Sequence, residues 1–462
     1  MKYTILIDFG STFTKSTVVD MEEQRVCYTF RTPSTVGTDA SLGLVTCLDQ
    51  IRQVIGEKAL LEARKLASSS AAGGLRMVVV GLTESLSLMA GKNAAYGAGA
   101  KIIASFSGIV TDAALEQIRS LDPEIILLCG GYEKGNSKWI LENAKRLAHA
   151  GGIKAPIVYA GNSQAAEAVH FLLYQNGKTC ILADNIIPAV NTLNIASTVE
   201  AVRDIFMKRI THMKGFDTVK QYIGPIVMPT PAAVLKGVRL LAEGTPTQPG
   251  WEQIMLVDMG GATTDVHSYA ATETLDGVRL VGAPEPRAKR TVEGDIGARE
   301  SVNSLLEAAD MRRIRKYSGL ADEEIHLCQD KRLEDHAFVP DTEKEKLFEQ
   351  AIAMEAVRVS VRRHAGQLYD GYTEGVQRIQ KGKDLMNIKA IIGTGGPIIN
   401  SIDPRSILAQ ALRTKAEKDV LLPEKAAFYL DTSYIFYAAG LLSGIDRETA
   451  MRILLDKLIP LT

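Results

Sequence analysis

Cysteine clusters, net charge and long apolar runs are all lacking in this chain of 462 residues. None of the five cysteines lies in a Cys-x-x-Cys pair or beside grouped histidines: Cys27, Cys47, Cys129, Cys180 and Cys328. This spacing argues against a zinc site or a cysteine nucleophile and predicts reduced, mostly buried thiols in a cytosolic protein. A net charge of −1 excludes the overall basic field that favours nucleic acid or an anionic membrane. We expect no transmembrane segment and no signal peptide.

The length and composition fit a soluble protein with more than one domain. A chain of 462 residues is too long for one hydrophobic core. Its hydrophobic content of 46% and charged content of 23% are ordinary for globular proteins.

The most informative stretch is the segment from Leu256 to Val266, which reads LVDMGGATTDV. It predicts a buried strand ending at Asp258, a turn of two glycines, two threonines, and a second strand. Glycine lets backbone N–H groups approach an anion, because no Cβ stands in the way. The flanking carboxylates suit Mg²⁺, which prefers oxygen ligands.

A second copy of this pattern opens the chain, where residues 4–20 read TILIDFGSTFTKSTVVD. Alone, either copy could be an ordinary Asp-Gly turn. Two copies about 250 residues apart indicate two similar half-molecules that grip one polyphosphate from both sides.

The pair resembles the phosphate-binding hairpins of the actin, sugar-kinase and heat-shock-chaperone ATPase superfamily. Residues 390–397, AIIGTGGP, are similar to its adenosine motif, and residues 431–442 to its second connecting helix. The resemblance implies an α/β, actin-like two-lobed ATPase fold, made of duplicated ribonuclease H-like domains. It also implies ATP and Mg²⁺ as cofactors.

The first connecting helix is expected near residues 225–235, with Pro231 in its first turn. The chaperone branch carries a glutamate just before this proline, whereas this chain has Thr230. The difference leaves ATP binding in place but removes a carboxylate that could polarise the attacking water.

Site roles follow from matching the superfamily motifs residue by residue. Asp8 and Asp258 are the expected catalytic and metal residues, Asp8 in the Mg²⁺ shell and Asp258 orienting Mg²⁺ or the lytic water. Asp265 either supports the Mg²⁺ ligands without binding the ion itself or is an ordinary strand residue. The expected nucleotide contacts are Gly10, Ser11, Thr12 and Lys15 for one phosphate group, Gly260, Gly261, Ala262 and Thr263 for the others, and Gly393, Thr394, Gly395 and Gly396 for adenosine.

Residues 67–83, ASSSAAGGLRMVVVGLT, are similar to a signature of the GlmL (glutamate-mutase MutL) family, which is unrelated to mismatch repair. The small residues alone would also fit a plain connecting loop. The resemblance implies an adenosylcobalamin-dependent mutase as partner and a reactivating or cofactor-loading role. A sugar-kinase-type enzyme and an actin-like scaffold are the alternatives, and an oligomer is left open.

Between residues 98 and 215, strands and helices alternate at a spacing typical of a parallel βαβ sheet, here an inserted Rossmann-like subdomain. Gly130-Gly131 and Gly161-Asn162 end two of its strands. We interpret them first as tight turns, because no Gly-x-Gly-x-x-Gly motif is present. The expected parts are 1–97 and 246–424 as the two lobes, 98–215 as the insert, 216–245 as the first connecting helix region, and 425–462 as the second connecting helix with a C-terminal helix.

Further expectations concern local elements. We predict a helix over 47–69, a charged, loop-rich segment over 309–345, and a helix over 372–380. Asp295 is a candidate helix N-cap, or the Gly294–Gly297 loop lies near the nucleotide, as a similar loop does in related ATPases. Arg358, Arg362 and Arg363 are expected to face water rather than a purine.

Overall fold

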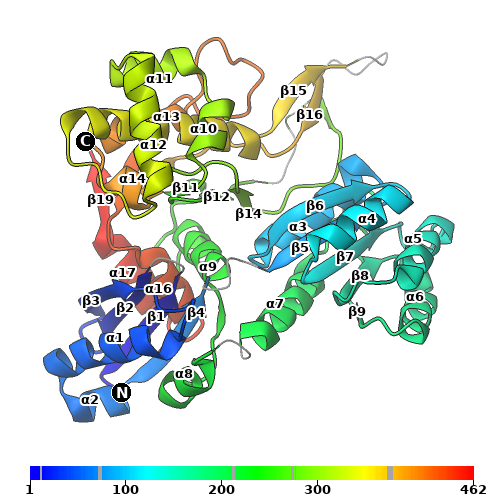
Figure 1. Ribbon diagram of the computed structural model, residues 1–462, viewed down its shortest axis with the longest axis horizontal. Helices are drawn as coiled ribbons and strands as arrows, with labels where there is room; N and C mark the ends of the chain where they lie inside the picture. The colour runs from blue at the N-terminus through cyan, green and yellow to red at the C-terminus, as the bar shows by residue number, and fades with distance from the viewer. Residues whose placement is uncertain (11–12, 71–74, 211–213, 272–274, 276, 372–377) are drawn as a thin grey trace. The chain divides into compact units, whose positions relative to one another are not determined.

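The structure is a computed structural model that describes residues 1–10, 13–70, 75–210, 214–271, 275, 277–371 and 378–462 (Figure 1). The chain forms two compact units. The first comprises residues 1–234, 281–286 and 440–445, and the second comprises 235–280, 287–439 and 446–462. Each unit is described by itself.

The first unit contains a five-stranded sheet in the order β10-β4-β1-β2-β3. β2 is antiparallel to its neighbours β1 and β3, whereas β1, β4 and β10 run parallel. β1 reads YTILIDF and is almost fully buried, as its apolar run predicts. The strands are β1 (Tyr3–Phe9), β2 (Phe13–Asp20), β3 (Arg25–Pro33), β4 (Arg64–Ser69) and β10 (Met228–Pro229).

The second unit repeats this topology in the sheet β14-β12-β11-β17-β18-β19. Its first three strands are again antiparallel, and β11, β17 and β18 again run parallel. Two sheets with the same order and directions confirm the expected actin-like fold of duplicated α/β domains. The strands are β11 (Ile254–Met259), β12 (Thr264–Tyr269), β14 (Ala288–Glu293), β17 (Ala390–Thr394), β18 (Ala427–Asp431) and the added antiparallel β19 (Leu458–Leu461).

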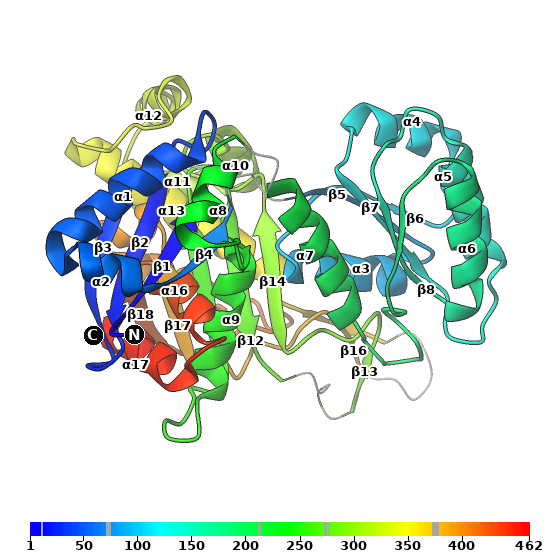
Figure 2. The same cartoon turned by 90° about the horizontal axis from the view of Figure 1, so that it is seen from below.

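A second sheet of the first unit is wholly parallel, in the order β6-β5-β7-β8-β9 (Figure 1; β5 to β8 are also labelled in Figure 2). Met77 and Val79 of β5 face one hydrophobic cluster, and Val78 and Val80 face another. The sheet is therefore covered on both faces, as parallel sheets usually are. Its elements are β5 (Arg76–Gly81), α3 (Met89–Gly97), β6 (Lys101–Ser107), α4 (Asp112–Leu121), β7 (Ile125–Gly130), α5 (Lys138–His149), β8 (Ile157–Gly161), α6 (Ser163–Gln175) and β9 (Cys180–Leu182).

The alternation predicted for this sheet is confirmed, strand by strand and helix by helix. Because β5 pairs with both β6 and β7, the sheet spans the predicted division between residues 97 and 98. The complete α/β subdomain thus begins near Arg76. A π-helical turn, η1 (Glu84–Leu88), follows β5 and precedes α3.

Several local predictions were wrong. The helix predicted over 47–69 is instead α1 (Ala40–Ile55), α2 (Glu57–Glu62) and the strand β4, because Ala67, Ser68 and Ser69 pair with β1. The supposedly loop-rich segment 309–345 contains two helices, α11 (Met311–Ser318) and α12 (Asp322–Glu334). The helix predicted over 372–380 is contradicted at its end by strand β16 (Arg378–Lys381), while residues 372–377 lie outside the described residues.

Other elements complete the two units. In the first unit they are α7 (Ala196–Ile210) and α8 (Phe216–Ile223). In the second they are α10 (Val302–Ala308), α13 (Glu343–His364), α14 (Gly396–Ile399), α15 (Pro404–Leu408), the 3₁₀ turn η2 (Ala409–Ala411), α17 (Arg447–Lys457) and the three-stranded sheet β13 (Val278–Leu280), β16 and β15 (Gln367–Asp370).

Two helices that resemble the connecting helices of the superfamily are present, α9 (Thr230–Glu243) and α16 (Ile435–Leu442). Gly440 touches the backbone of α9, since a Cβ added there would overlap the carbonyl oxygen of Ala233. Small residues therefore stand where the two helices meet, as the sequence predicts.

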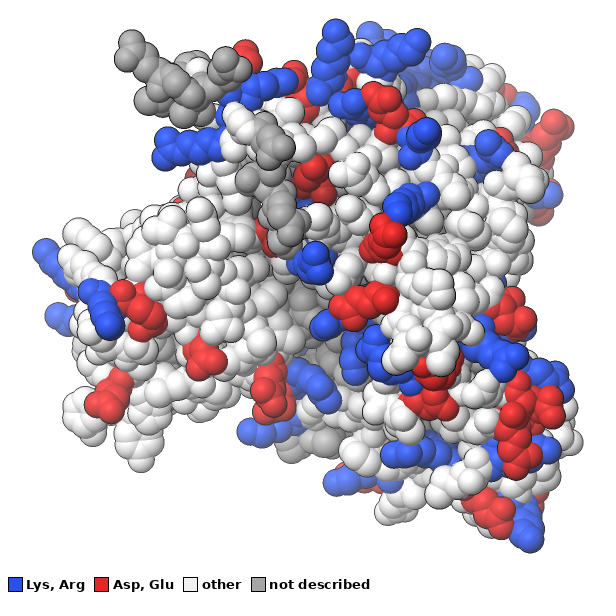
Figure 3. All heavy atoms as spheres, turned by 180° about the vertical axis from the view of Figure 1, so that it is seen from behind, with Lys and Arg blue, Asp and Glu red and all other residues white. Residues whose placement is uncertain are grey.

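Charged side chains of both signs are interspersed over the face shown in Figure 3, in keeping with a net charge of −1. Within the described ranges, no helix combines the length and the apolar character that crossing a bilayer requires.

Gly440→Ala tests the helix contact. We expect the free energy of unfolding to fall by about 3 kcal/mol, the upper end of the usual effect of overpacking, as measured by urea denaturation. Gly151→Ala is the matched control, because no atom lies within 4 Å of its added Cβ. Its effect should stay within about 0.5 kcal/mol. Equal effects of the two substitutions would contradict a close helix contact.

Candidate functional site

Asp8 lies near the end of β1 and is only 2% exposed. Its carboxylate accepts hydrogen bonds from the hydroxyls of Ser68, at 3.0 Å, and Thr230. Lys15 stands opposite it in the β1–β2 ladder. A carboxylate is thus held in place by a neighbouring strand, β4, and by the first residue of α9.

Burial raises the pKa of Asp8, and the nearby Lys15 ammonium and the hydrogen bonds from Thr230 and Ser68 offset only part of this rise. The ionised form therefore lacks full solvation in the protein alone. A bound cation would supply part of the missing stabilisation, so this environment fits an oxygen ligand of Mg²⁺.

The turn after Asp8 is closed by a backbone hydrogen bond from the Gly10 N–H to the Phe13 carbonyl, at 3.0 Å. A Cβ at Gly10 would lie 2.6 Å from that carbonyl oxygen, so the turn requires glycine. The Ser34 hydroxyl donates to the Gly10 carbonyl at 2.7 Å. This hydrogen bond further stabilises the position of Gly10. The predicted phosphate contacts Ser11 and Thr12 lie outside the described residues.

The second hairpin is built in the same way. Asp258 precedes Gly260 by two residues, as Asp8 precedes Gly10, and the Gly260 N–H donates to the Thr263 carbonyl at 2.8 Å. The two Asp-x-Gly turns therefore occupy equivalent positions in the two copies of the sheet.

A loop that follows β14 supports this second turn. The N–H groups of Ala298 and Arg299 donate to the carbonyls of Gly260 and Gly261, at 3.1 and 2.8 Å. The Ser301 hydroxyl donates to the Ala262 carbonyl at 2.7 Å. These three hydrogen bonds hold the turn of the second hairpin against the loop after β14.

The prediction that Asp295 caps a helix was wrong. α10 begins at Val302 with Ser301 at its N-cap position, six residues later. The Asp295 carboxylate instead binds the Arg363 guanidinium at 3.0 Å. The Gly294–Gly297 segment belongs to the loop against the hairpin, where a Cβ on Gly297 would overlap the Gly261 carbonyl oxygen.

Asp265, for which the sequence left two roles open, is part of an ion pair. The Arg290 Nε donates to its carboxylate at 2.7 Å, and the Thr263 hydroxyl lies 3.3 Å from its other oxygen. Arg290 is 5% exposed. Asp265 therefore ties the hairpin to β14, and it pairs with Asp258 across the β11–β12 ladder.

The segment that resembles the adenosine motif adjoins the second hairpin. Thr394 pairs with Asp258 between parallel strands, and its hydroxyl donates to the Asp431 carbonyl at 2.9 Å. Gly395 has a φ of +92°, and an added Cβ would overlap the Met259 carbonyl oxygen and lie 2.8 Å from an Asp258 carboxylate oxygen.

The two other glycines of this segment have different surroundings. A Cβ at Gly393 would press on Ile398 and Leu408, so this glycine allows α14 and α15 to pack over the strand. Gly396 begins α14, and the nearest atom to an added Cβ there is the Asn400 Nδ2, at 4.0 Å. Within the second unit, the structure therefore brings Asp258, the Gly260–Thr263 turn and Gly393–Gly396 together.

The prediction that the arginines of α13 face water was wrong, because all three form ion pairs. Arg358 binds Glu355 at 2.8 Å, Arg362 binds Glu417 at 2.5 Å, and Arg363 binds Glu293 and Asp295. Their charges are neutralised by carboxylates from the helix itself and from neighbouring segments, which sequence spacing could not reveal.

Two residues of the site were missed by sequence reasoning. Ser68 was placed in a helix and Thr230 was noted only for lacking a carboxylate, yet both hydroxyls bind Asp8. The run of serines before residue 71 was the available signal for Ser68.

Among the described residues, no three His, Cys, Asp or Glu side chains cluster closely enough to form a metal cage. Asp8 and Asp258 each offer a carboxylate that fits Mg²⁺ held together with phosphate oxygens and water, which is how this ion is usually bound.

The duplicated sheet with an Asp-x-Gly hairpin in each copy defines the class of actin-like kinases and ATPases. Solved structures similar to this chain include xylulose kinases from Lactobacillus acidophilus (12% identity, 100% of this chain and 93% of that chain, TM-score 0.37) and Bifidobacterium adolescentis (10% identity, 99% and 94%, TM-score 0.34). The assignment depends on the repeated strand order and not on these low scores.

The chain belongs to the MutL family, whose model, described as MutL protein, matches residues 4–458. It is also 41% identical over 457 residues to Protein MutL of Clostridium tetanomorphum, covering 98% of this chain and 99% of that protein. The family resemblance inferred from the sequence is confirmed.

Asp8→Asn tests the electrostatics of the first hairpin. The raised pKa means that the folded state binds this proton more tightly than the unfolded state. Wild-type stability from this group is therefore present below the ordinary pKa of aspartate, about 4, and falls as pH rises through the raised value. Since asparagine does not ionise, the variant should gain stability relative to wild type as pH rises above the ordinary pKa of aspartate, about 4.

The measurement is the difference in melting temperature between the variant and wild type across this pH range. Asp112→Asn is the control, because the Asp112 side chain is 97% exposed. A difference for Asp8→Asn that stays constant or shrinks with rising pH would contradict the assignment of a raised pKa.

Proposed function

We propose that this protein is an ATP-binding, slowly ATP-hydrolysing accessory protein that reactivates or loads an adenosylcobalamin-dependent amino-acid mutase such as glutamate mutase. The observation that carries the ATP part is the repetition of one Asp-x-Gly turn, closed by the same backbone hydrogen bond, in two copies of one sheet.

In this proposal the two turns bind the phosphates of one ATP. Gly10 and Lys15, with Ser11 and Thr12, contact one part of the triphosphate, and Gly260, Gly261, Ala262 and Thr263 contact the rest. Gly393 to Gly396 flank adenosine. Glycine suits such contacts because backbone N–H groups can approach phosphate closely.

The carboxylates Asp8 and Asp258 bind or orient Mg²⁺, which neutralises phosphate charge when bound. The hydroxyls of Ser68 and Thr230 fix the rotamer of Asp8. Because Thr230 offers a hydroxyl and not a carboxylate, the attacking water has no general base at this position. We therefore expect slow hydrolysis, which suits a protein whose nucleotide state regulates binding more than turnover.

The mutase part of the proposal depends on membership of the MutL family and on the resemblance to its glutamate-mutase branch. Adenosylcobalamin enzymes lose cofactor integrity during turnover, so a nucleotide-driven partner that exchanges damaged cofactor would serve them. The expected partners are the mutase subunits.

ATP binding is tested by thermal unfolding with and without Mg²⁺-ATP. A ligand at about 100 times its Kd stabilises the folded state by about 2.7 kcal/mol, so the melting temperature of the wild type should rise. Asp8→Asn and Asp258→Asn should lose most of this rise and lose ATPase activity, while Asp112→Asn keeps both. Undiminished ATPase activity in either site variant would place the metal site elsewhere.

The partner is tested by affinity capture from the native host, with and without ATP, followed by mass spectrometry. We expect the subunits of an adenosylcobalamin-dependent mutase, with a yield that changes with ATP. The Asp258→Asn variant is the control and should lose the ATP dependence. Capture of no cobalamin enzyme under either condition would overturn the mutase role and leave the ATPase proposal standing.

A further inference from the structure

The parallel sheet of the first unit contains a pocket at the ends of three adjacent strands. Residues that directly follow β5, β6 and β7 line it, namely Leu82 and Thr83, Gly108 and Ile109, and Gly131 and Tyr132. Its volume is about 420 Å³, which lies in the range of small-molecule sites.

The position of this pocket follows from the strand order. The connection after β5 leads to β6 on one side, and the connection after β7 leads to β8 on the other, so the two loops diverge between the carboxyl ends of β5 and β7. Open α/β sheets bind ligands at this topological switch point, because the diverging loops leave a crevice there. The sheet of the duplicated lobes is not involved, so this is a second candidate site.

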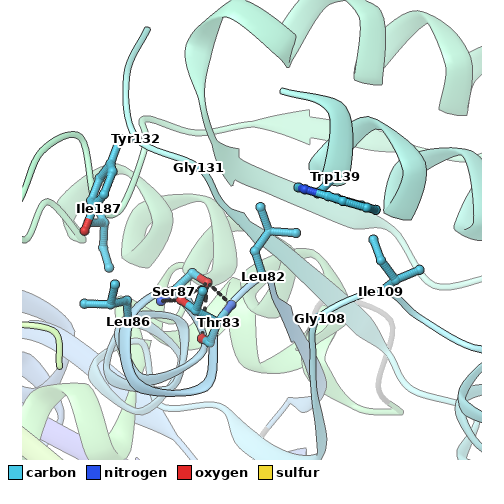
Figure 4. A pocket seen from close by; sticks show the side chains of 10 residues that line it. All are labelled: Leu82, Thr83, Leu86, Ser87, Gly108, Ile109, Gly131, Tyr132, Trp139 and Ile187. Carbon is cyan, nitrogen blue, oxygen red and sulfur yellow. Dashed lines mark hydrogen bonds between the residues drawn. The ribbon is translucent and has the colours of Figure 1, made fainter. Parts of the chain in front are cut away.

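The lining is neutral and largely apolar. It consists of six aliphatic or aromatic side chains, of which Tyr132 also carries a hydroxyl, two small hydroxyl side chains and two glycines: Leu82, Leu86, Ile109, Tyr132, Trp139 and Ile187, Thr83 and Ser87, and Gly108 and Gly131. Figure 4 shows the rings of Tyr132 and Trp139 on opposite sides, with Leu82 between them.

The hydroxyls of Thr83 and Ser87 are already engaged with each other and with the backbone of their own turn. The Thr83 N–H donates to the Ser87 hydroxyl at 3.0 Å, and the Ser87 N–H lies 3.3 Å from the Thr83 hydroxyl oxygen. They therefore add little polar recognition. The described residues that line the pocket include no Lys or Arg, so a phosphate or carboxylate would have no charged partner among them.

The walls of the pocket are fixed by hydrogen bonds before any ligand binds. The Asn185 amide donates to the Gly131 carbonyl at 2.9 Å, and the Ile187 N–H donates to the Asn185 side-chain oxygen at 3.0 Å. Gly130 has a φ of +134°, and a Cβ there would lie 2.7 Å from Leu82, so the glycine lets Leu82 cover the strand end. A preformed apolar pocket binds without ordering its own loops.

Trp139 is the second residue of α5, and its side chain is half exposed. The next residue, Ile140, is fully buried. Lys138 covers it only in part, with its ammonium 5.1 Å from the ring centroid. An aromatic ring that both lines a pocket and remains accessible is suited to contact a flat ligand.

From the neutral wall, the two aromatic rings and the position at the strand switch, we infer that this pocket is a binding site for an uncharged, planar aromatic molecule of two or three rings. The Gly130-Gly131 segment, first interpreted as a tight turn, forms part of this site. The inference is independent of the proposed nucleotide site, which lies on other sheets.

The probe is N-phenyl-1-naphthylamine, a neutral compound of two linked ring systems whose absorption overlaps tryptophan emission. The chain has two tryptophans, so Trp251→Phe leaves Trp139 as the sole donor. Phenylalanine keeps a ring against Tyr429, whose centroid lies 4.6 Å from that of Trp251. We expect saturable, one-to-one energy transfer from Trp139 to the probe in this full-length variant.

Ile109→Phe, added to the same background, should fill the pocket and weaken probe binding by at least about tenfold, which corresponds to about 1.4 kcal/mol. Phe171→Ala is the matched control, because Phe171 is an exposed aromatic residue on the neighbouring helix α6 and does not line the pocket. It should leave the affinity unchanged. Circular dichroism and the melting temperature of each variant establish that it is folded.

A negatively charged analogue of the probe, 1-anilino-8-naphthalenesulfonate, tests whether the pocket prefers uncharged ligands. It adds one sulfonate to the same rings and should bind at least about tenfold more weakly than the neutral probe. Linear, non-saturable transfer, equal binding to the Ile109→Phe variant, or a preference for the sulfonate would each overturn the inference. A pocket that accepts only a side chain of a partner protein would give no saturable energy transfer to the probe. That result would also overturn the inference.

Discussion

A single backbone hydrogen bond, from a glycine N–H to the carbonyl three residues later, shapes each of the two Asp-x-Gly turns. The bond fixes the turn so tightly that a Cβ on Gly10 would overlap its acceptor. Strands on either side then continue into the same five-strand pattern in both units. The carboxylates, the hydroxyls that contact them and the neighbouring glycine segment all take their positions from these two turns.

The first unit adds to its turn a carboxylate that is buried but not fully compensated. Asp8 receives two hydroxyl hydrogen bonds, and burial still raises its pKa. The second unit instead supports its turn through hydrogen bonds that the loop after β14 donates to the carbonyls of the turn, and through the Asp265–Arg290 pair. The two copies thus share a strand order and differ in the side chains that stabilise the turn.

Most of the fold could be predicted from the sequence because its signals are local. An apolar run followed by Asp-x-Gly identified both hairpins, and the alternation between residues 101 and 182 identified the parallel sheet. The misses came where distant segments decide the outcome. Ser68 lies on a strand because β1 provides a partner 60 residues away, and Arg363 binds carboxylates about 70 residues away. The contact of Thr230 with Asp8 spans 222 residues, and no spacing rule predicts it.

Thr230 has two structural duties at once, as the first residue of α9 and as a hydrogen-bond donor to Asp8. The pKa of Asp8, at the end of β1, therefore depends on the orientation of α9. If α9 turned about its axis by a fraction of a revolution, the hydroxyl would be withdrawn, and the carboxyl group would hold its proton more firmly. A mechanical displacement would in this way be converted into a chemical one, without any change in the residues of the turn itself.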